Sequence, residues 1–94
     1  MIYVKVHEKV VAMCDEDLIG KKFEDDTRQL EVSEHFFKGD LKSEEEVVLI
    51  MKEASNLNLV GNNVVRLAVK EGIVHENEII EVQGVKHAQR YMLK

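Results

Sequence analysis

The stretch SEEEVVLIMKEAS, residues 43–55, carries the clearest local signal in the chain and separates two unlike halves. Ser43, followed three residues later by Glu46, forms a capping box, a pattern that begins a helix. The glutamates of the first turn lie where the helix dipole favours negative charge. Apolar residues then recur at helical spacing and predict one buried stripe. The residues of this stripe are Val47, Ile50, Met51 and Ala54.

The half before this helix is rich in strand signals. IYVKV (2–6) alternates with a period of two, and KVVAMC (9–14) is a second β-rich run. The polar residues between these runs predict a β-hairpin. RQLEV (28–32) is a third predicted strand, whereas FEDDTR (23–28) is typical of an exposed loop.

The half after this helix contains a second helix and a returning strand. The second helix is predicted over 62–71, with Gly72 at the position of a left-handed C-cap. NLNLVG (56–61) is interpreted as a tight connection between the two helices. EIIEV (78–82) is the next predicted strand, and GVKHAQRYMLK (84–94) predicts a turn followed by a short strand or helix.

This order of elements predicts an α+β fold. We expect a small antiparallel or mixed sheet with an N-terminal β-hairpin and two main helices on one face. Ninety-four residues suit a single domain, 1–94.

Composition narrows the class of protein. The net charge of −5 argues against general attraction to nucleic acid, although it leaves room for a local basic patch. Cys14 is the only cysteine, which excludes an internal disulfide and a four-cysteine zinc site. The chain has no apolar run of membrane-spanning length, and its start does not read as a signal peptide. We therefore expect a cytoplasmic protein without membrane contact, and no motif predicts a metal or cofactor.

Three short motifs, CDEDLIGK (14–21), NLVG (58–61) and GVKHAQ (84–89), occur in this order along the chain. In their order and spacing they resemble an archaeal family of small conserved proteins classified only as a domain of unknown function. The family usually carries proline where this chain has Lys86. The resemblance implies a cytoplasmic archaeal protein, points to these motifs as residues of interest, and comes with no established reaction.

The first motif places Cys14 and Asp15 at the predicted end of a strand. Neighbouring carboxylates disfavour the thiolate, so Cys14 is poorly suited to nucleophilic chemistry. We interpret Cys14 as half-buried and Asp15 as the cap of a short helical turn that ends at Gly20. The run DEDLIGKKFEDD (15–26) superficially resembles a calcium loop, but Ile19 is no oxygen ligand, so we expect a solvated acidic loop.

The second motif leads into the predicted second helix. Gly61 and the amides of Asn62 and Asn63 lie at the helix start, where free N–H groups bind anions. Arg66 follows one turn later and suits the same role. The alternative is a tight interhelical turn in which Asn62 is the cap.

The third motif raises the question of why His87 and Gln89 flank the small Ala88. If this segment is extended, His87 and Gln89 share one face and Ala88 occupies the other. His87 then either satisfies a buried backbone group or belongs to a nucleic-acid surface. The residues of the basic cluster behind the second hypothesis are Lys86, His87, Arg90, Tyr91 and Lys94.

These observations favour a binding module, with RNA or the ribosome as its partner, and they lean against an enzyme. Two alternatives stay open. One is a protein–protein adaptor or homodimer that uses an exposed strand edge or the C-terminal residues 91–93. The other is a small enzyme or ligand-binding protein that uses Cys14 and His87.

Overall fold

The computed structural model describes residues 1–92. The strands of this part are β1 (Ile2–Val6), β2 (Val11–Asp15), β3 (Lys22–Glu24), β4 (Gln29–Glu31), β5 (Asp40–Lys42), β6 (Leu57–Val60), β7 (Ile80–Val82) and β8 (Val85–Arg90). The α-helices are α1 (Glu34–Phe37), α2 (Glu44–Glu53) and α3 (Asn62–Lys70). Two short 3-10 helices, η1 (Glu16–Leu18) and η2 (Glu76–Glu78), complete the elements.

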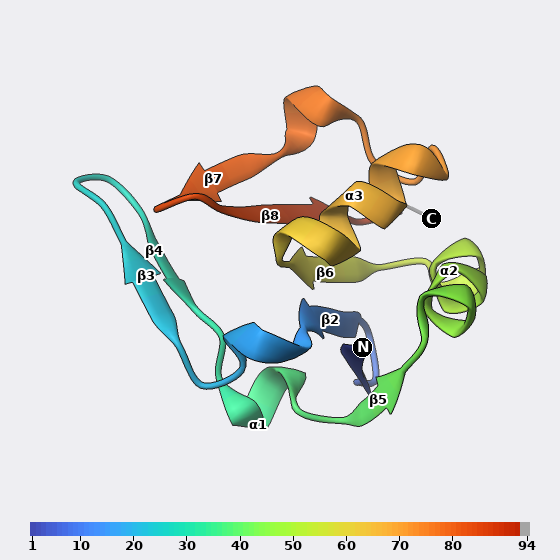
Figure 1. The fold of residues 1–94 in the computed structure, drawn as a ribbon. Helices are drawn as coiled ribbons and strands as arrows, with labels where there is room; N and C mark the ends of the chain where they lie inside the picture. The colour runs from blue at the N-terminus through green and yellow to red at the C-terminus, as the bar shows by residue number, and fades with distance from the viewer. Residues whose placement is uncertain (93–94) are drawn as a thin grey trace.

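Six strands form one mixed sheet in the order β5-β1-β2-β6-β8-β7. β2 and β6 pair in parallel, and the other neighbours are antiparallel. The predicted N-terminal hairpin is confirmed by the β1–β2 register, in which Ile2 lies opposite Asp15 and Val6 opposite Val11. The predicted α+β class and mixed sheet are therefore correct (Figure 1).

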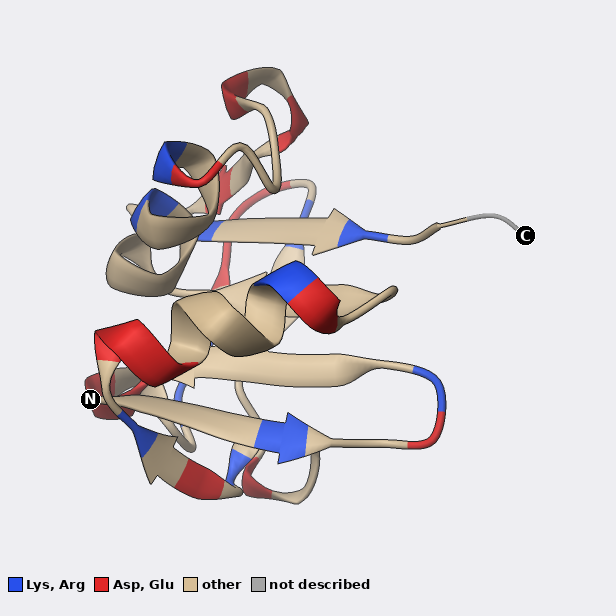
Figure 2. Ribbon diagram, turned by 90° about the vertical axis from the view of Figure 1, so that its right-hand side faces the viewer, with Lys and Arg blue, Asp and Glu red and all other residues tan. Residues whose placement is uncertain are grey.

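The two main helices pack on one face of this sheet, as predicted. Val47 and Met51 of α2 join Val64 and Ala68 of α3 in a buried cluster over the central strands. The capping box at the start of α2 is present: the Glu46 amide donates to Ser43 Oγ at 3.3 Å, and the Ser43 amide donates to Glu46 Oε1 at 3.2 Å. Figure 2 shows the acidic first turn of α2 and the basic residue near its end, which suit the helix dipole.

The opposite face of the sheet is covered by α1 and by the separate β3–β4 hairpin, which extends from the body in Figure 1. Phe37 of α1 and Leu30 of β4 are buried in this second cluster. The expectation of an exposed loop at 23–28 is wrong in part, because Phe23 and Glu24 belong to β3. Only the turn that follows is loop, and there Asp25 Oδ1 accepts the amides of Thr27 and Arg28.

The interpretation of NLNLVG as an interhelical turn is wrong, because residues 57–60 form the central strand β6. Leu57 and Leu59 are fully buried on the side of the helices, and Val60 is fully buried on the other side. β6 lies between β2 and β8, so these apolar residues are enclosed on both faces of the sheet. The position of β6 in the interior of the sheet explains this two-sided burial.

Candidate functional site

The three sequence motifs meet in space at one end of the central strands. Asp15 closes β2, Gly61 follows β6, and Gly84 precedes β8. The Asp15 carboxylate accepts the amide of Asn63 through Oδ2 and the amide of Val64 through Oδ1, both at 2.9 Å. Asp15 thus caps α3 from a distant part of the chain.

This arrangement corrects two expectations about helix capping. Asp15 precedes η1, but its side chain makes no capping hydrogen bond there and serves α3 instead. Asn62 is not the cap of α3, because the N-cap position is Gly61. Asn62 bonds the third motif: its Nδ2 donates to the Gly84 carbonyl at 3.1 Å, and its Oδ1 accepts the Lys86 amide at 3.0 Å.

Gly61 is the residue that lets these segments approach one another. Its φ is 126°, a backbone conformation that favours glycine, and its amide donates to the Lys86 carbonyl at 2.8 Å. A Cβ at this position would lie 2.3 Å from Cγ of Asp15. A side chain here would therefore displace the Asp15 carboxylate from α3.

The start of α3 is consequently a poor anion site. The Asn63 amide, which the sequence suggested to be free, is already bonded to Asp15. A small hollow of about 230 Å³ lies beside it and is lined by Asp15, Asp17, Leu18, Asn62, Asn63 and Val85. The two carboxylates in this lining repel an incoming phosphate. Gly61, Asn62 and Asn63 therefore organise the fold at this point.

Cys14 is fully buried, deeper than the half-buried position predicted. Burial, and then the charges of Asp15 and Asp17, raise the pKa of its thiol to about 12. In the sheet register Cys14 lies opposite Val60, and Val60 lies opposite His87. Two strand spacings separate Cys14 from His87 by about 10 Å, so the histidine is too far away to activate the thiol.

His87 lies on the face of the sheet opposite α2 and α3. The third motif forms a strand, which is one of the two structures predicted for it. Ala88 is buried on the helix side. Nε2 of His87 lies 3.0 Å from Oδ1 of Asn58, so its partner is a side chain on β6 and not the backbone group of the first alternative. Burial lowers the pKa of His87.

The basic cluster of the sequence is divided between the two faces of β8. Side chains alternate along a strand, so Lys86 and Arg90 are directed to the helix side, and His87 and Gln89 to the other side. Tyr91 follows the strand and is exposed, and Arg90 donates to Met92 Sδ at 3.1 Å. Lys94 lies outside the described residues.

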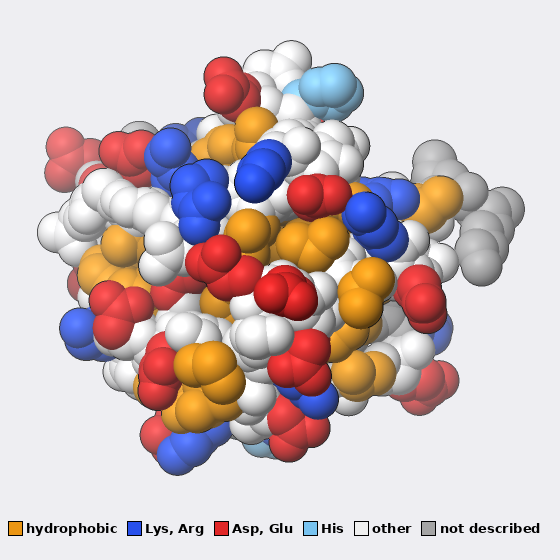
Figure 3. Space-filling model, turned by 45° about the vertical axis from the view of Figure 1, so that its right-hand side comes forward, with side chains coloured by type: hydrophobic (Ala, Val, Ile, Leu, Met, Phe, Trp, Pro, Cys, Tyr) orange, Lys and Arg blue, Asp and Glu red, His pale blue; other side chains and the backbone are white. Residues whose placement is uncertain are grey.

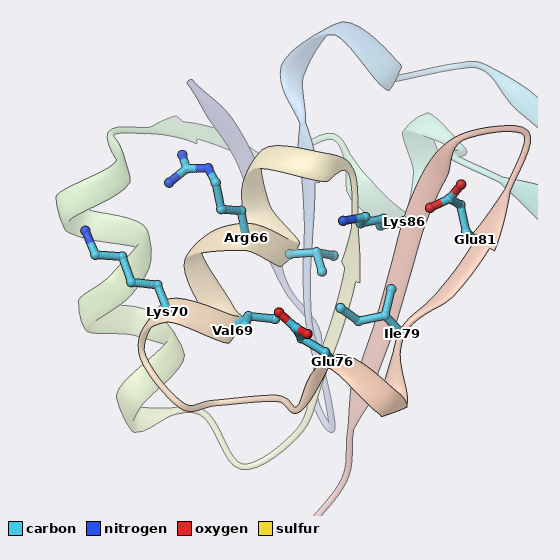
Figure 4. Close-up of a pocket in the computed structure, with 8 residues that line it drawn as sticks. Arg66, Val69, Lys70, Glu76, Ile79, Glu81 and Lys86 are labelled. Atoms are coloured by element: carbon cyan, nitrogen blue, oxygen red, sulfur yellow. The ribbon is translucent and has the colours of Figure 1, made fainter.

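Lys86 instead joins α3 at a larger hollow, which we call the α3–β7 hollow. Its volume is about 540 Å³. It is lined by Val65, Arg66, Val69, Lys70, Glu76, Ile79, Glu81 and Lys86. In Figure 4, Lys86 and Glu76 extend toward α3, whereas Arg66 and Lys70 extend from α3 toward α2.

The α3–β7 hollow has an apolar floor and a mixed charged rim. Val65 is buried, and Val69 and Ile79 are partly buried against the core. Arg66 is paired with Glu44 at 3.2 Å between two exposed side chains, a contact that contributes little and is readily exchanged. Figure 3 shows basic side chains gathered on this side of the molecule, with acidic and hydrophobic surface between them.

Sequence reasoning named Arg66 and Lys86 but missed the rest of this lining. Lys70 follows Arg66 by one helical turn, and this spacing could have predicted that the two side chains lie on the same side of α3. Ile79, Glu76 and Glu81 come from a segment whose approach to α3 depends on the order of strands in the sheet. Among residues 1–92, no three His, Cys, Asp or Glu side chains are placed to hold a metal ion.

Comparison with known proteins gives a family and a fold. A model of the family described as "Protein of unknown function (DUF424)" matches residues 4–93. A solved structure titled "Crystal structure of an uncharacterized conserved protein from Methanopyrus kandleri", an archaeal protein, is 28% identical to the chain with a TM-score of 0.77. That match covers 98% of this chain and 91% of the other. A search of curated proteins found no match.

Proposed function

The chain belongs to the DUF424 family of proteins of unknown function, and from this premise and the geometry of the site we propose that it is a binding module for single-stranded RNA. The α3–β7 hollow is the proposed contact surface, and the cytoplasm is the proposed place of action. The observation that carries the proposal is that Lys86 extends into one apolar hollow whose α3 side carries two further basic residues, Arg66 and Lys70.

The chemistry of the hollow matches both parts of a nucleotide. Basic side chains attract phosphate oxygens, and arginine does so through two parallel hydrogen bonds. The floor of Val65, Val69 and Ile79 offers an apolar surface against which a base packs. Arg66 and Lys70 share one side of α3, so they suit successive phosphates of one strand.

The acidic character of the protein shapes the kind of binding that we propose. With a net charge of −5, the molecule as a whole repels RNA, and only the local basic residues attract it. Contact is therefore short and confined to a few nucleotides. If all three basic residues contact phosphates, the slope of log K against log salt for single-stranded RNA should be about −2.

The positions of Cys14 and His87 do not favour the alternative that the protein is an enzyme. Cys14 is buried with a pKa of about 12, and His87 is hydrogen-bonded to Asn58 on the other face. Neither contributes to the lining of the α3–β7 hollow. The proposal is accordingly one of binding without covalent chemistry.

Titration of short single-stranded RNA at two salt concentrations tests the proposal. Lys86→Ala and Lys70→Ala should each weaken binding, and the loss should be greater at low salt because salt screens phosphate contacts. Lys38→Ala is the matched control. Lys38 is an exposed lysine that follows α1, pairs with Glu34 and lies outside the hollow. Equal binding by wild type, Lys86→Ala and Lys70→Ala would exclude this surface.

An adaptor or homodimer is the second candidate, and the edge strand β7 favours it. β7 ends the six-stranded sheet, and its Ile80 side chain is 38% exposed. An outer strand with free backbone groups is a template for strand addition from another chain. Sedimentation over a range of protein concentrations tests self-association, and a monomer throughout would exclude the homodimer.

A further inference from the structure

The α3–β7 hollow presents opposite charges on two sides of its apolar floor. Lys86 reaches in from β8, and Glu76 reaches in from η2 (Figure 4). Glu81 lies directly opposite Lys86 in the β7–β8 register and adds a second carboxylate beside the lysine. A surface that only held phosphates would gain nothing from these carboxylates, because like charges repel. They therefore point to a ligand that also carries hydrogen-bond donors.

Among the RNA bases, guanine has the donors and acceptors that match this pair. Its N1–H and N2–H groups are adjacent donors that both oxygens of one carboxylate accept together. Its O6 and N7 atoms are acceptors on the neighbouring edge, where a lysine donates. Adenine and cytosine place a ring acceptor beside their amino group, which repels the second carboxylate oxygen. Uracil has a single N–H between two carbonyl groups.

Resting on the proposed function, we propose that the α3–β7 hollow selects a guanine base of single-stranded RNA. Glu76 accepts from N1–H and N2–H, and Lys86 donates to O6. The ring packs on Val65, Val69 and Ile79, while Arg66 and Lys70 contact flanking phosphates. A volume of about 540 Å³ is sufficient for one nucleotide.

The test compares short RNAs of equal length that differ at one central base. The probes are oligouridine and oligouridine with one guanosine, inosine, adenosine or cytidine at its centre. Wild type should bind the guanosine probe about fivefold or more tightly than oligouridine, the lower limit for a good bidentate base contact. The inosine probe, which lacks the 2-amino group, should fall between them.

Two variants separate base recognition from binding of the RNA backbone. Glu76→Gln should abolish the guanosine preference and leave the affinity for oligouridine unchanged or higher, since a repulsive charge is removed. Glu53→Gln is the matched control, because Glu53 lies at the end of α2 outside the hollow. It should retain the guanosine preference.

The outcomes distinguish this inference from the proposed function. Equal affinity of wild type for all five probes, or a guanosine preference that survives Glu76→Gln, would overturn the guanine assignment and leave RNA binding intact. Absence of binding to every probe at low salt would overturn the proposed function and this inference with it. A preference for adenosine or cytidine would equally overturn the assignment to guanine.

Discussion

Asp15 is the one charged residue within residues 1–92 that is buried. It is 5% exposed, and each of its carboxylate oxygens accepts one backbone amide at the start of α3. Burial raises its pKa above the usual range for a carboxyl group, while the Asn63 and Val64 amides act in the opposite direction. These contacts join β2 to α3 and, through Gly61 and Asn62, to the turn before β8.

Asp15→Asn should lower the free energy of unfolding by about 1–3 kcal/mol. The amide side chain retains one acceptor oxygen, and its NH₂ group then faces a backbone N–H that has lost its partner. Urea unfolding curves would measure the change. Asp17→Asn is the control, because Asp17 lines the same small hollow but is exposed and bonds neither amide. A midpoint for Asp15→Asn equal to that of wild type would show that the cap contributes nothing.

His87 should make stability depend on pH. Burial lowers its pKa in the folded protein below the value of 6.5, so the unfolded chain binds the proton more readily. The contribution of neutral His87 to the free energy of unfolding is therefore complete above pH 6.5. It is lost as the pH falls toward the lower pKa of the folded protein. His87→Gln retains a polar side chain near its hydrogen-bond partner Asn58 but has no such titration.

Urea midpoints of wild type and His87→Gln, measured at about pH 7.5 and about pH 5, would test this. The wild-type midpoint should fall more on acidification than the midpoint of the variant. An equal fall in the two proteins would assign the pH dependence to other groups.

At the scale of elements, α2 could be predicted almost completely because its signals are local. Ser43 and Glu46 lie three residues apart, and the apolar stripe follows within the same segment. β6 was missed because its four residues follow a helix and precede another, and Asn58 reads as part of a turn. Its identity depends on burial between β2 and β8, which are distant in sequence.

Short strands were missed for a related reason. β3 contains Lys22, Phe23 and Glu24, and β5 is equally brief and polar, so neither presents a clear apolar alternation. Each becomes a strand through its partner: β3 pairs with β4, and β5 pairs with β1. A strand formed by pairing alone leaves little trace in its own residues.

Ser43→Ala tests the element that was predicted best. Loss of the hydroxyl leaves the Glu46 amide without its capping oxygen, and the expected destabilisation is about 0.5–2 kcal/mol. Ser33→Ala is an informative comparison, because Ser33 accepts the Phe36 amide at the start of the four-residue α1. Urea unfolding would measure both. An unchanged midpoint for Ser43→Ala would mean that the cap of α2 is replaced by water without cost.

At the scale of the whole molecule, the three motifs serve one junction in the fold. Asp15, Gly61, Asn62 and the Gly84 turn interlock where β2, β6 and β8 meet α3. The sequence indicated which residues to watch, but an amide that looks free at a helix start is occupied by a carboxylate 48 positions away. The candidate binding surface lies nearby on the helix side, and for the same reason only Arg66 and Lys86 of its lining were predicted.

The lengths and compositions of the helices show whether any of them could span a membrane. None of the helices in residues 1–92 is long and apolar enough to cross a bilayer. The exposed apolar residues are dispersed over the surface and include Val6 at the end of β1 and Leu49 on α2.

Cys14 provides a probe of the cooperativity of the entire fold. It lies at the centre of the sheet with no exposed surface, and its pKa of about 12 leaves almost no thiolate at neutral pH. Because β2 is enclosed by β1, β6, α3 and α1, a reagent reaches the thiol only when these elements separate.

We expect native Cys14 to react with a thiol reagent far more slowly than a free cysteine, and the denatured protein to react rapidly. Asp15→Asn should accelerate native labelling in proportion to its loss of stability if the fold opens as one unit. Labelling followed by mass spectrometry over a range of low urea concentrations would measure both rates. Native labelling as fast as that of a free thiol would show that the sheet opens locally at β2, and it would return Cys14 to the list of candidate reactive residues.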